Sequence, residues 1–305
     1  MGAVTVRPKK RKYIDPLSDP GFKLLLNPED NPEELRALLN ALLPPDRQIA
    51  ELRPLQQERI GIEVDFERTV IYDLACVGLD GTKFIVEVQR LRRMDLDARL
   101  VYYAARQITA SVTRGQTMFE YPDVVVVAIL GFAVPDYEGA VHRVDLRRDD
   151  GVKWSSKLSF VFASLGNFHA TEEELETPAD EWLYLLKNLE TMTEAPERYT
   201  QNWVFGQFLS NAEYANLNAR DRDRYDAWWL KVTEEHSIRQ AMEEDVRAEV
   251  AAKVKAEVKE EVKAERTREV VYNSHDLGLA LAQIARIAAV PEAEVQRILA
   301  ARASR

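Results

Sequence analysis

Asp73 and Glu87 lie in two neighbouring segments, 69–77 and 83–89, that are rich in the β-branched and aromatic residues typical of strands. Two carboxylates on one strand face repel each other unless a divalent cation lies between them. Oxygen ligands of this kind suit Mg²⁺, which keeps several waters and completes its shell with phosphate oxygens. A cation held there would lower the pKa of an attacking water and neutralise the charge that develops during phosphodiester cleavage. The spacing therefore favours phosphodiester hydrolysis, provided that the two side chains meet.

The register of the hairpin between these segments decides whether they meet. A two-residue turn over 80–81 would place Asp73 opposite Val88 and leave Glu87 on the other face. A three-residue loop over 79–81, with its glycine in the left-handed conformation, would pair Asp73 with Glu87 and bring their Cβ atoms within about 4.5–5.5 Å. We predict the three-residue loop. The alternative is a solvent-facing hairpin on which both acids are ordinary polar surface residues.

A second group of polar residues could hold a phosphate beside this hairpin. Arg99, Tyr103 and Arg106 are spaced four and three residues apart and therefore share one face of an expected helix. Two arginines and a hydroxyl on one face are suited to contact the DNA backbone. Packing of Tyr103 against the arginine side chains in solvent is the competing explanation.

Apolar periodicity indicates the elements that position these residues. It predicts a helix over 32–43, strands through most of 49–90 with a clear alternation over 60–66, and a helix over 96–112. The continuous β-branched run 124–127 is typical of a strand that is covered on both faces. Together these elements predict an α/β or α+β core whose mixed sheet is flanked by helices.

The chain after residue 165 becomes helical and, from residue 234, highly charged. Valines recur every four residues from Val246 to Val262, so they drift about 40° per step around a helix and form no coiled-coil seam. This drift favours an exposed arm, while a weak right-handed self-association through the charged helix remains open. We expect a basic tail (1–12), an α/β core (13–165), a helical domain (166–233), a charged helical arm (234–270) and a small helical hairpin (271–305).

The C-terminal hairpin is similar to a helix-turn-helix, with small residues at Ala285 and Ala289. Its second helix begins with Glu292 and Glu294, which place carboxylates where base and phosphate contacts belong. Acids at a helix N-terminus are first explained by the helix dipole. We therefore favour a helical cap or a protein contact over DNA reading by this hairpin.

The order of elements and several motifs resemble the PD-(D/E)XK nuclease superfamily, and within it the Rpn-type family of recombination-promoting nucleases and putative transposases. The resemblance covers about 13–165. The segments that carry it are Pro16–Lys23, Leu39–Leu43, Tyr72-Asp73, Val86–Gln89, Arg99–Tyr103 and Gly115.

This resemblance implies a DNA endonuclease that depends on Mg²⁺ or another divalent cation and serves recombination, transposition or mobile-element and phage functions. It implies Asp73 and Glu87 as catalytic cation ligands, with Gln89 positioning the attacking water. Asp19 matches the early acid of the family and would be an accessory acid, although Ser18-Asp19-Pro20 is also an ordinary turn or cap sequence.

The chain departs from the wider superfamily at Gln89, where a lysine is usual and a neutral amide can only form hydrogen bonds. The Rpn-type group commonly carries this Glu-x-Gln, so the resemblance implies that activity is retained. Lys83 cannot supply the missing charge because four strand residues place it roughly 13 Å from Glu87. The alternative function is an inactive nuclease fold that binds DNA or protein, and a further one is a mobile-element scaffold assembled through the arm.

Composition limits the partners and the compartment. The net charge of −10 requires any contact with DNA to be local. The single Cys76 lies in an apolar run and predicts a buried, inert thiol in a reducing compartment. We find no secretory signal after the basic N-terminus and no apolar stretch of about 20 residues, which predicts a cytoplasmic protein with no membrane partner.

Overall fold

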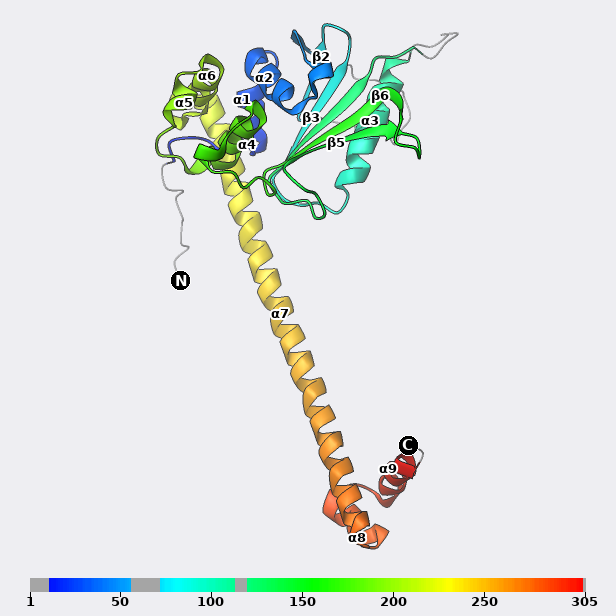
Figure 1. Ribbon diagram of the computed structural model, residues 1–305. Coiled ribbons are helices and arrows are strands. Elements are labelled where there is room, and N and C mark those ends of the chain that lie inside the picture. The colour runs from blue at the N-terminus through cyan, green and yellow to red at the C-terminus, as the bar shows by residue number, and fades with distance from the viewer. Residues whose placement is uncertain (1–10, 56–71, 113–119, 304–305) are drawn as a thin grey trace, which may run out of the picture. The chain divides into compact units, whose positions relative to one another are not determined.

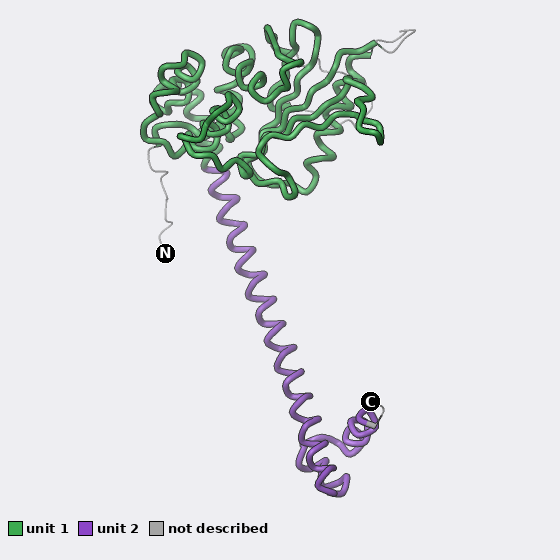
Figure 2. Tube along the Cα trace, in the orientation of Figure 1, with its two compact units in different colours: residues 1–229 green, residues 230–305 purple. Residues whose placement is uncertain are grey.

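The computed structural model describes residues 11–55, 72–112 and 120–303. It divides into two compact units, Met1–Trp229 and Leu230–Arg305, which Figure 2 shows in separate colours. Most of the predicted basic tail, the alternating run 60–66 and Gly115 lie outside the described residues. The helices of the described ranges are α1 (Asp19–Leu26), α2 (Pro32–Leu42), α3 (Leu96–Ser111), α4 (Pro178–Asn188), α5 (Glu197–Thr200), α6 (Trp203–Ala212), α7 (Ala219–Asp276), α8 (Leu281–Ala288) and α9 (Glu292–Ala303).

Within the described residues, a six-stranded mixed sheet forms the centre of the first unit (Figure 1). The pairs β1–β2, β2–β3 and β5–β6 are antiparallel, whereas β4 is parallel to both β3 and β6. Helix α3 connects β3 to β4 and provides the crossover that two parallel strands require. The mixed α/β fold class predicted from the sequence is confirmed. In spatial order the strands are β1 (Leu52–Pro54), β2 (Leu74–Gly78), β3 (Lys83–Gln89), β4 (Val124–Leu130), β6 (Lys153–Ser164) and β5 (Val141–Arg147).

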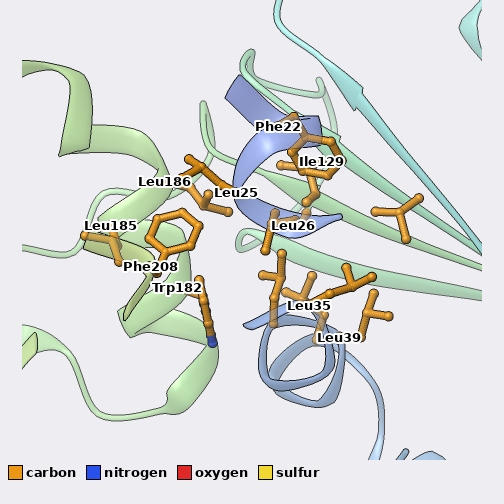
Figure 3. Close-up of a cluster of buried hydrophobic side chains, with 14 of the residues drawn as sticks. Phe22, Leu25, Leu26, Leu35, Leu39, Ile129, Trp182, Leu185, Leu186 and Phe208 are labelled. Atoms are coloured by element: carbon orange, nitrogen blue, oxygen red, sulfur yellow. The ribbon is translucent and has the colours of Figure 1, made fainter. Parts of the chain in front are cut away.

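Helices cover both faces of the sheet. On one face, α1, α2, α4 and α6 share one buried cluster with the sheet. Phe22 of α1 lies beside Ile129 of β4, whereas α4 and α6 pack on α2 (Figure 3). On the other face, α3 packs through Leu100 and Ala104. The odd-numbered residues Val125, Val127 and Ile129 of β4 belong to the first cluster, and its even-numbered residues belong to the second. The prediction that this strand is covered on both faces is confirmed.

The first unit includes the helices predicted after residue 165 and a hairpin that periodicity did not predict. The helices between residues 178 and 212 share one hydrophobic core with α1, α2 and the sheet, so they pack within the same unit as the predicted 13–165 core. The hairpin β5–β6 was not predicted. No residue of β5 and none in the first half of β6 is fully buried, so neither segment has the apolar pattern of a core strand. Strand β6 nevertheless pairs along the whole length of β4.

Helix α1 precedes the helix predicted over 32–43 and was also not predicted. Ser18 caps it: the Ser18 hydroxyl accepts a hydrogen bond from the Gly21 N–H (3.0 Å) and donates one to the Asp15 carbonyl (2.6 Å). A Cβ at Gly21 would lie 2.2 Å from the Asp15 carbonyl oxygen, so only glycine allows this approach. The interpretation of Ser18-Asp19-Pro20 as a cap is confirmed. At eight residues, α1 is too short for periodicity to reveal it.

The second unit contains most of α7 together with α8 and α9. The five valines from Val246 to Val262 are 50–58 % exposed, in agreement with an exposed helical arm. The two short helices predicted near the C-terminus are confirmed, and they pack on α7 through Val271, Ile284 and Val295. Among the described residues, we find no helix with the length and apolarity that crossing a bilayer requires.

Candidate functional site

The hairpin between β2 and β3 has the predicted three-residue loop. Val77 pairs with Lys83 and Leu74 with Val86, and this register places Asp73 directly opposite Glu87. The loop is closed by two backbone hydrogen bonds, from the Gly78 N–H to the Thr82 carbonyl (2.8 Å) and from the Gly81 N–H to the Gly78 carbonyl (2.9 Å). Gly81 has a φ of +86°. The left-handed glycine therefore sets the register that brings the two acids together.

Hydrogen bonds hold Asp73 and Glu87 against each other's backbone. The Asp73 N–H donates to the Glu87 Oε1 (3.2 Å), and the Val88 N–H donates to the Asp73 Oδ2 (2.8 Å). Each carboxylate thus uses one oxygen within the hairpin. The remaining oxygens are available to a ligand at the edge of the sheet where β2 begins and β3 ends.

Burial makes this pair of carboxylates costly to ionise. Glu87 is only 6 % exposed. Its pKa rises to about 8, first because of burial and then because of the neighbouring Asp73 charge. Burial also raises the pKa of Asp73, while the Val88 N–H lowers it. A buried and a partly buried acid with raised pKa values, side by side, are an arrangement that a bound cation would stabilise in the ionised form.

Gln89 follows Glu87 by two residues and therefore lies on the same face of β3. Its side-chain amide forms no hydrogen bond with any described residue, so it is available to water or substrate. Lys83 lies at the opposite end of β3, where its ammonium donates to the Ser111 hydroxyl (2.9 Å). It does not replace the lysine absent from position 89. It is half-buried against α3.

Two cations, neither of them predicted as a partner of the carboxylates, offset the negative charge of Asp73 and Glu87. The positive charges of Arg99 on α3 and Lys23 on α1 both lower the pKa values of Asp73 and Glu87. Lys23 also forms an ion pair with Asp19 one turn earlier (2.5 Å). Asp19 in turn raises the pKa of Asp73 and so lies close enough to repel it. Lys23 is the last residue of the segment Pro16–Lys23 that carries the family resemblance. Its i,i+4 spacing from Asp19 is a second signal, on a helix that periodicity did not predict.

Of the three residues predicted on one face of α3, Tyr103 is buried, whereas Arg99 and Arg106 are half-buried. Tyr103 is 9 % exposed and packs edge-on against Tyr72, with ring centroids 5.4 Å apart. Its hydroxyl accepts a hydrogen bond from Arg99 (2.7 Å), whose guanidinium also lies over the ring. Packing of Tyr103 with an arginine is therefore present, but within the core and not in solvent. Arg99 is thereby held close to the two acids.

The fit of a divalent cation can be judged from the donors present. Among the described residues, no group of three or more His, Cys, Asp or Glu is placed to hold a metal ion. Two carboxylates with free oxygens and a nearby amide form a hard, oxygen-rich donor set. Mg²⁺ is typically bound by one or two carboxylates together with waters and substrate phosphates, so these residues fit it.

Cys76 has no place in this chemistry. It is a free, fully buried thiol on β2, and burial raises its pKa to about 12. The sequence prediction of a buried cysteine is confirmed.

Comparison with known proteins places most of the chain in a family. A family model described as PD-(D/E)XK nuclease family transposase matches residues 16–236, well over half of the chain. No match was found to a curated protein or to a solved structure. The matched range contains every candidate site residue described above.

Proposed function

The chain belongs to the family of PD-(D/E)XK nuclease transposases, and we propose that it is a DNA endonuclease whose divalent cation is held by Asp73 and Glu87. The observation that supports this proposal is the three-residue loop at Gly81, which sets these two acids opposite each other. We propose Mg²⁺ as the cation and a role in recombination, transposition or mobile-element functions of the Rpn type. The cytoplasm supplies both DNA and Mg²⁺ and keeps a free thiol such as Cys76 reduced.

In this function each residue has a separate task. When bound, the cation lowers the pKa of a water and offsets negative charge on the phosphate. Asp73 and Glu87 hold it through the oxygens that the hairpin leaves free. The Gln89 amide orients the attacking water by a hydrogen bond. Lys23 supplies the positive charge that a lysine at position 89 would otherwise provide, because it already acts on both carboxylates. Asp19 holds Lys23 in place as the accessory acid.

DNA would approach along the loop that follows β3 and the first turns of α3. This loop contains Arg92 and Arg93, both exposed, and Met94, which is completely exposed. Arg99 and Arg106 continue the positive charge along α3. Such a local basic surface is required because the chain as a whole carries a charge of −10. Apolar side chains flanked by arginines are suited to contact a DNA groove.

The test is plasmid nicking by the full chain with and without Mg²⁺. We expect nicking with Mg²⁺, none with a chelator, and a loss of at least 100-fold in Asp73→Ala. Asp46→Ala, which removes an exposed acid elsewhere in the first unit, is the matched control and should cleave like the parent. Equal cleavage by Asp73→Ala and the parent would contradict the proposal.

The second candidate is a nuclease fold that binds DNA or protein without cleaving it. The observation in its favour is the neutral Gln89 in place of a lysine. Under this alternative the parent protein would bind DNA in a chelator and show no nicking at any Mg²⁺ concentration.

A further inference from the structure

A cavity of about 330 Å³ opens beside Asp73. Its walls come from α1, from the residues at the start of β2 and from the first turns of α7. Asp73 is therefore both a candidate cation ligand and a part of the cavity wall. The volume is at the lower end of the range found for small-molecule sites.

The walls of this cavity combine apolar side chains with polar and charged ones. Leu24, Leu74 and Leu217 contribute apolar surface, and Leu74 and Leu217 are almost fully buried. Asn27 and Asp221 contribute hydrogen-bond acceptors and, from the amide, a donor. This mixture is suited to a flat, partly polar group such as a nucleobase.

A positively charged side chain, Arg224, lies in the same wall. Arg224 is exposed on α7, and it forms no hydrogen bond or ion pair with any described residue. Lys23 lines the cavity on the side of α1. A guanidinium that is free to form two parallel hydrogen bonds is a strong ligand for a phosphate.

The wall formed by α7 is held in place before any ligand binds. The Asp15 N–H donates to the Tyr225 hydroxyl (2.7 Å), and Tyr225 is only 6 % exposed. At the start of the helix, the Asp221 N–H donates to the Asn218 side chain (2.9 Å). A preformed cavity costs little ordering when it is filled.

We propose that this cavity is a binding subsite for one unpaired nucleotide of the DNA strand whose phosphodiester reaches Asp73 and Glu87. The inference rests on the proposed function for the position of that phosphodiester. A nucleotide joined to it lies within one step of the cavity that Asp73 borders. A base inside a duplex is stacked and paired and cannot enter, whereas an unpaired base enters without the cost of unpairing. The apolar walls take the base, and Arg224 takes its phosphate.

The test is DNA binding by the full chain in a chelator, where the proposed cleavage cannot occur. Fluorescence anisotropy compares a labelled duplex that carries one bulged nucleotide with the same duplex fully paired. We expect the parent to bind the bulged duplex at least tenfold more tightly. Leu24→Trp fills the cavity and should reduce this preference to less than twofold, with Leu79→Trp at an exposed leucine of the hairpin loop as its control.

A second pair of variants does not touch the core. Arg224→Ala should weaken binding of the bulged duplex about tenfold, whereas Arg220→Ala, at an exposed arginine of the same helix outside the cavity wall, should leave it unchanged. Circular dichroism checks that each variant is folded. If Leu24→Trp does not fold, the result with Arg224→Ala decides the test.

A parent preference below twofold, or a preference kept in Arg224→Ala, would overturn the subsite. A bulge preference without Mg²⁺-dependent nicking would overturn the proposed function and leave the subsite standing. Mg²⁺-dependent nicking without a preference for the bulged duplex would overturn the subsite and leave the proposed function standing.

Discussion

Glu87→Gln should stabilise the metal-free protein at neutral pH, because it removes a carboxyl that the fold keeps from ionising. The pKa of Glu87 is about 8 in the folded protein, against an ordinary value of 4.5. Between these two values the unfolded chain has released its proton while the folded chain keeps it. Stability of the parent therefore falls as pH rises through this window and changes no further above about pH 8.

The size of the effect follows from the same two pKa values. Each pH unit within the window costs about 1.4 kcal/mol, so the loss at pH 7 is on the order of 3 kcal/mol relative to pH 4.5. The glutamine keeps the volume of the side chain and can still accept the Asp73 N–H hydrogen bond. For a unit of this size, such a gain would raise the unfolding temperature by roughly 5–10 °C.

The assay is urea unfolding of the full chain in a chelator at pH 5, 7 and 8.5. We expect parent and Glu87→Gln to differ little at pH 5 and the variant to be more stable at the two higher pH values. Glu138→Gln, at an exposed glutamate, is the control and should follow the parent. A constant difference between parent and Glu87→Gln over this range would refute the assignment of a buried, neutral Glu87.

Addition of Mg²⁺ should reduce the difference in stability between the parent and Glu87→Gln. A cation at 100 times its dissociation constant stabilises a folded protein by about 2.7 kcal/mol, and it requires the ionised carboxylates. We expect Mg²⁺ to stabilise the parent more at pH 8.5 than at pH 6 and to have no effect on Glu87→Gln. Equal stabilisation of both proteins by Mg²⁺ would show that the cation binds elsewhere.

Other predictions test the turn, the amide, the thiol and the arm. Gly81→Val forces a β-branched residue to a φ of +86°; it should cost about 2–3 kcal/mol in urea unfolding and weaken Mg²⁺ binding, whereas Gly81→Asn should cost less. Gln89→Ala should slow nicking, and Gln89→Lys should change its Mg²⁺ dependence, either by helping to offset the developing charge or by pairing with Glu87; a Gln89→Ala rate equal to that of the parent would remove Gln89 from the site. Cys76, buried and with a pKa of about 12, should not react with a thiol reagent at pH 8 until the protein unfolds, and rapid labelling would contradict its burial. Deletion of 234–305 should lower the mass measured by light scattering only by that of the missing residues, because the drifting valines form no seam; a halved mass would instead reveal self-association through the arm.

Local features of the sequence were sufficient for the hairpin that carries the candidate site. The turn sequence ends in a glycine, and only a left-handed Gly81 allows the loop that pairs Asp73 with Glu87. The helices α2 and α3, the buried strand β4 and the C-terminal helical pair were likewise predicted, because each has its own apolar period and its own start or stop signal.

The surroundings of the site depended on contacts between residues far apart in the chain. Lys23 acts on Glu87 across 64 positions of the sequence, and the cavity joins α1 to the start of α7. Helix α1 was missed because it is short. Strands β5 and β6 were missed because only the pairing of β6 with β4, and of β5 with β6, makes them part of the sheet. The raised pKa of Glu87 likewise depends on the packed structure, because burial is its largest cause. Sequence spacing determines which residues share a strand or helix face, whereas burial and the fields of distant charges exist only once the chain has packed.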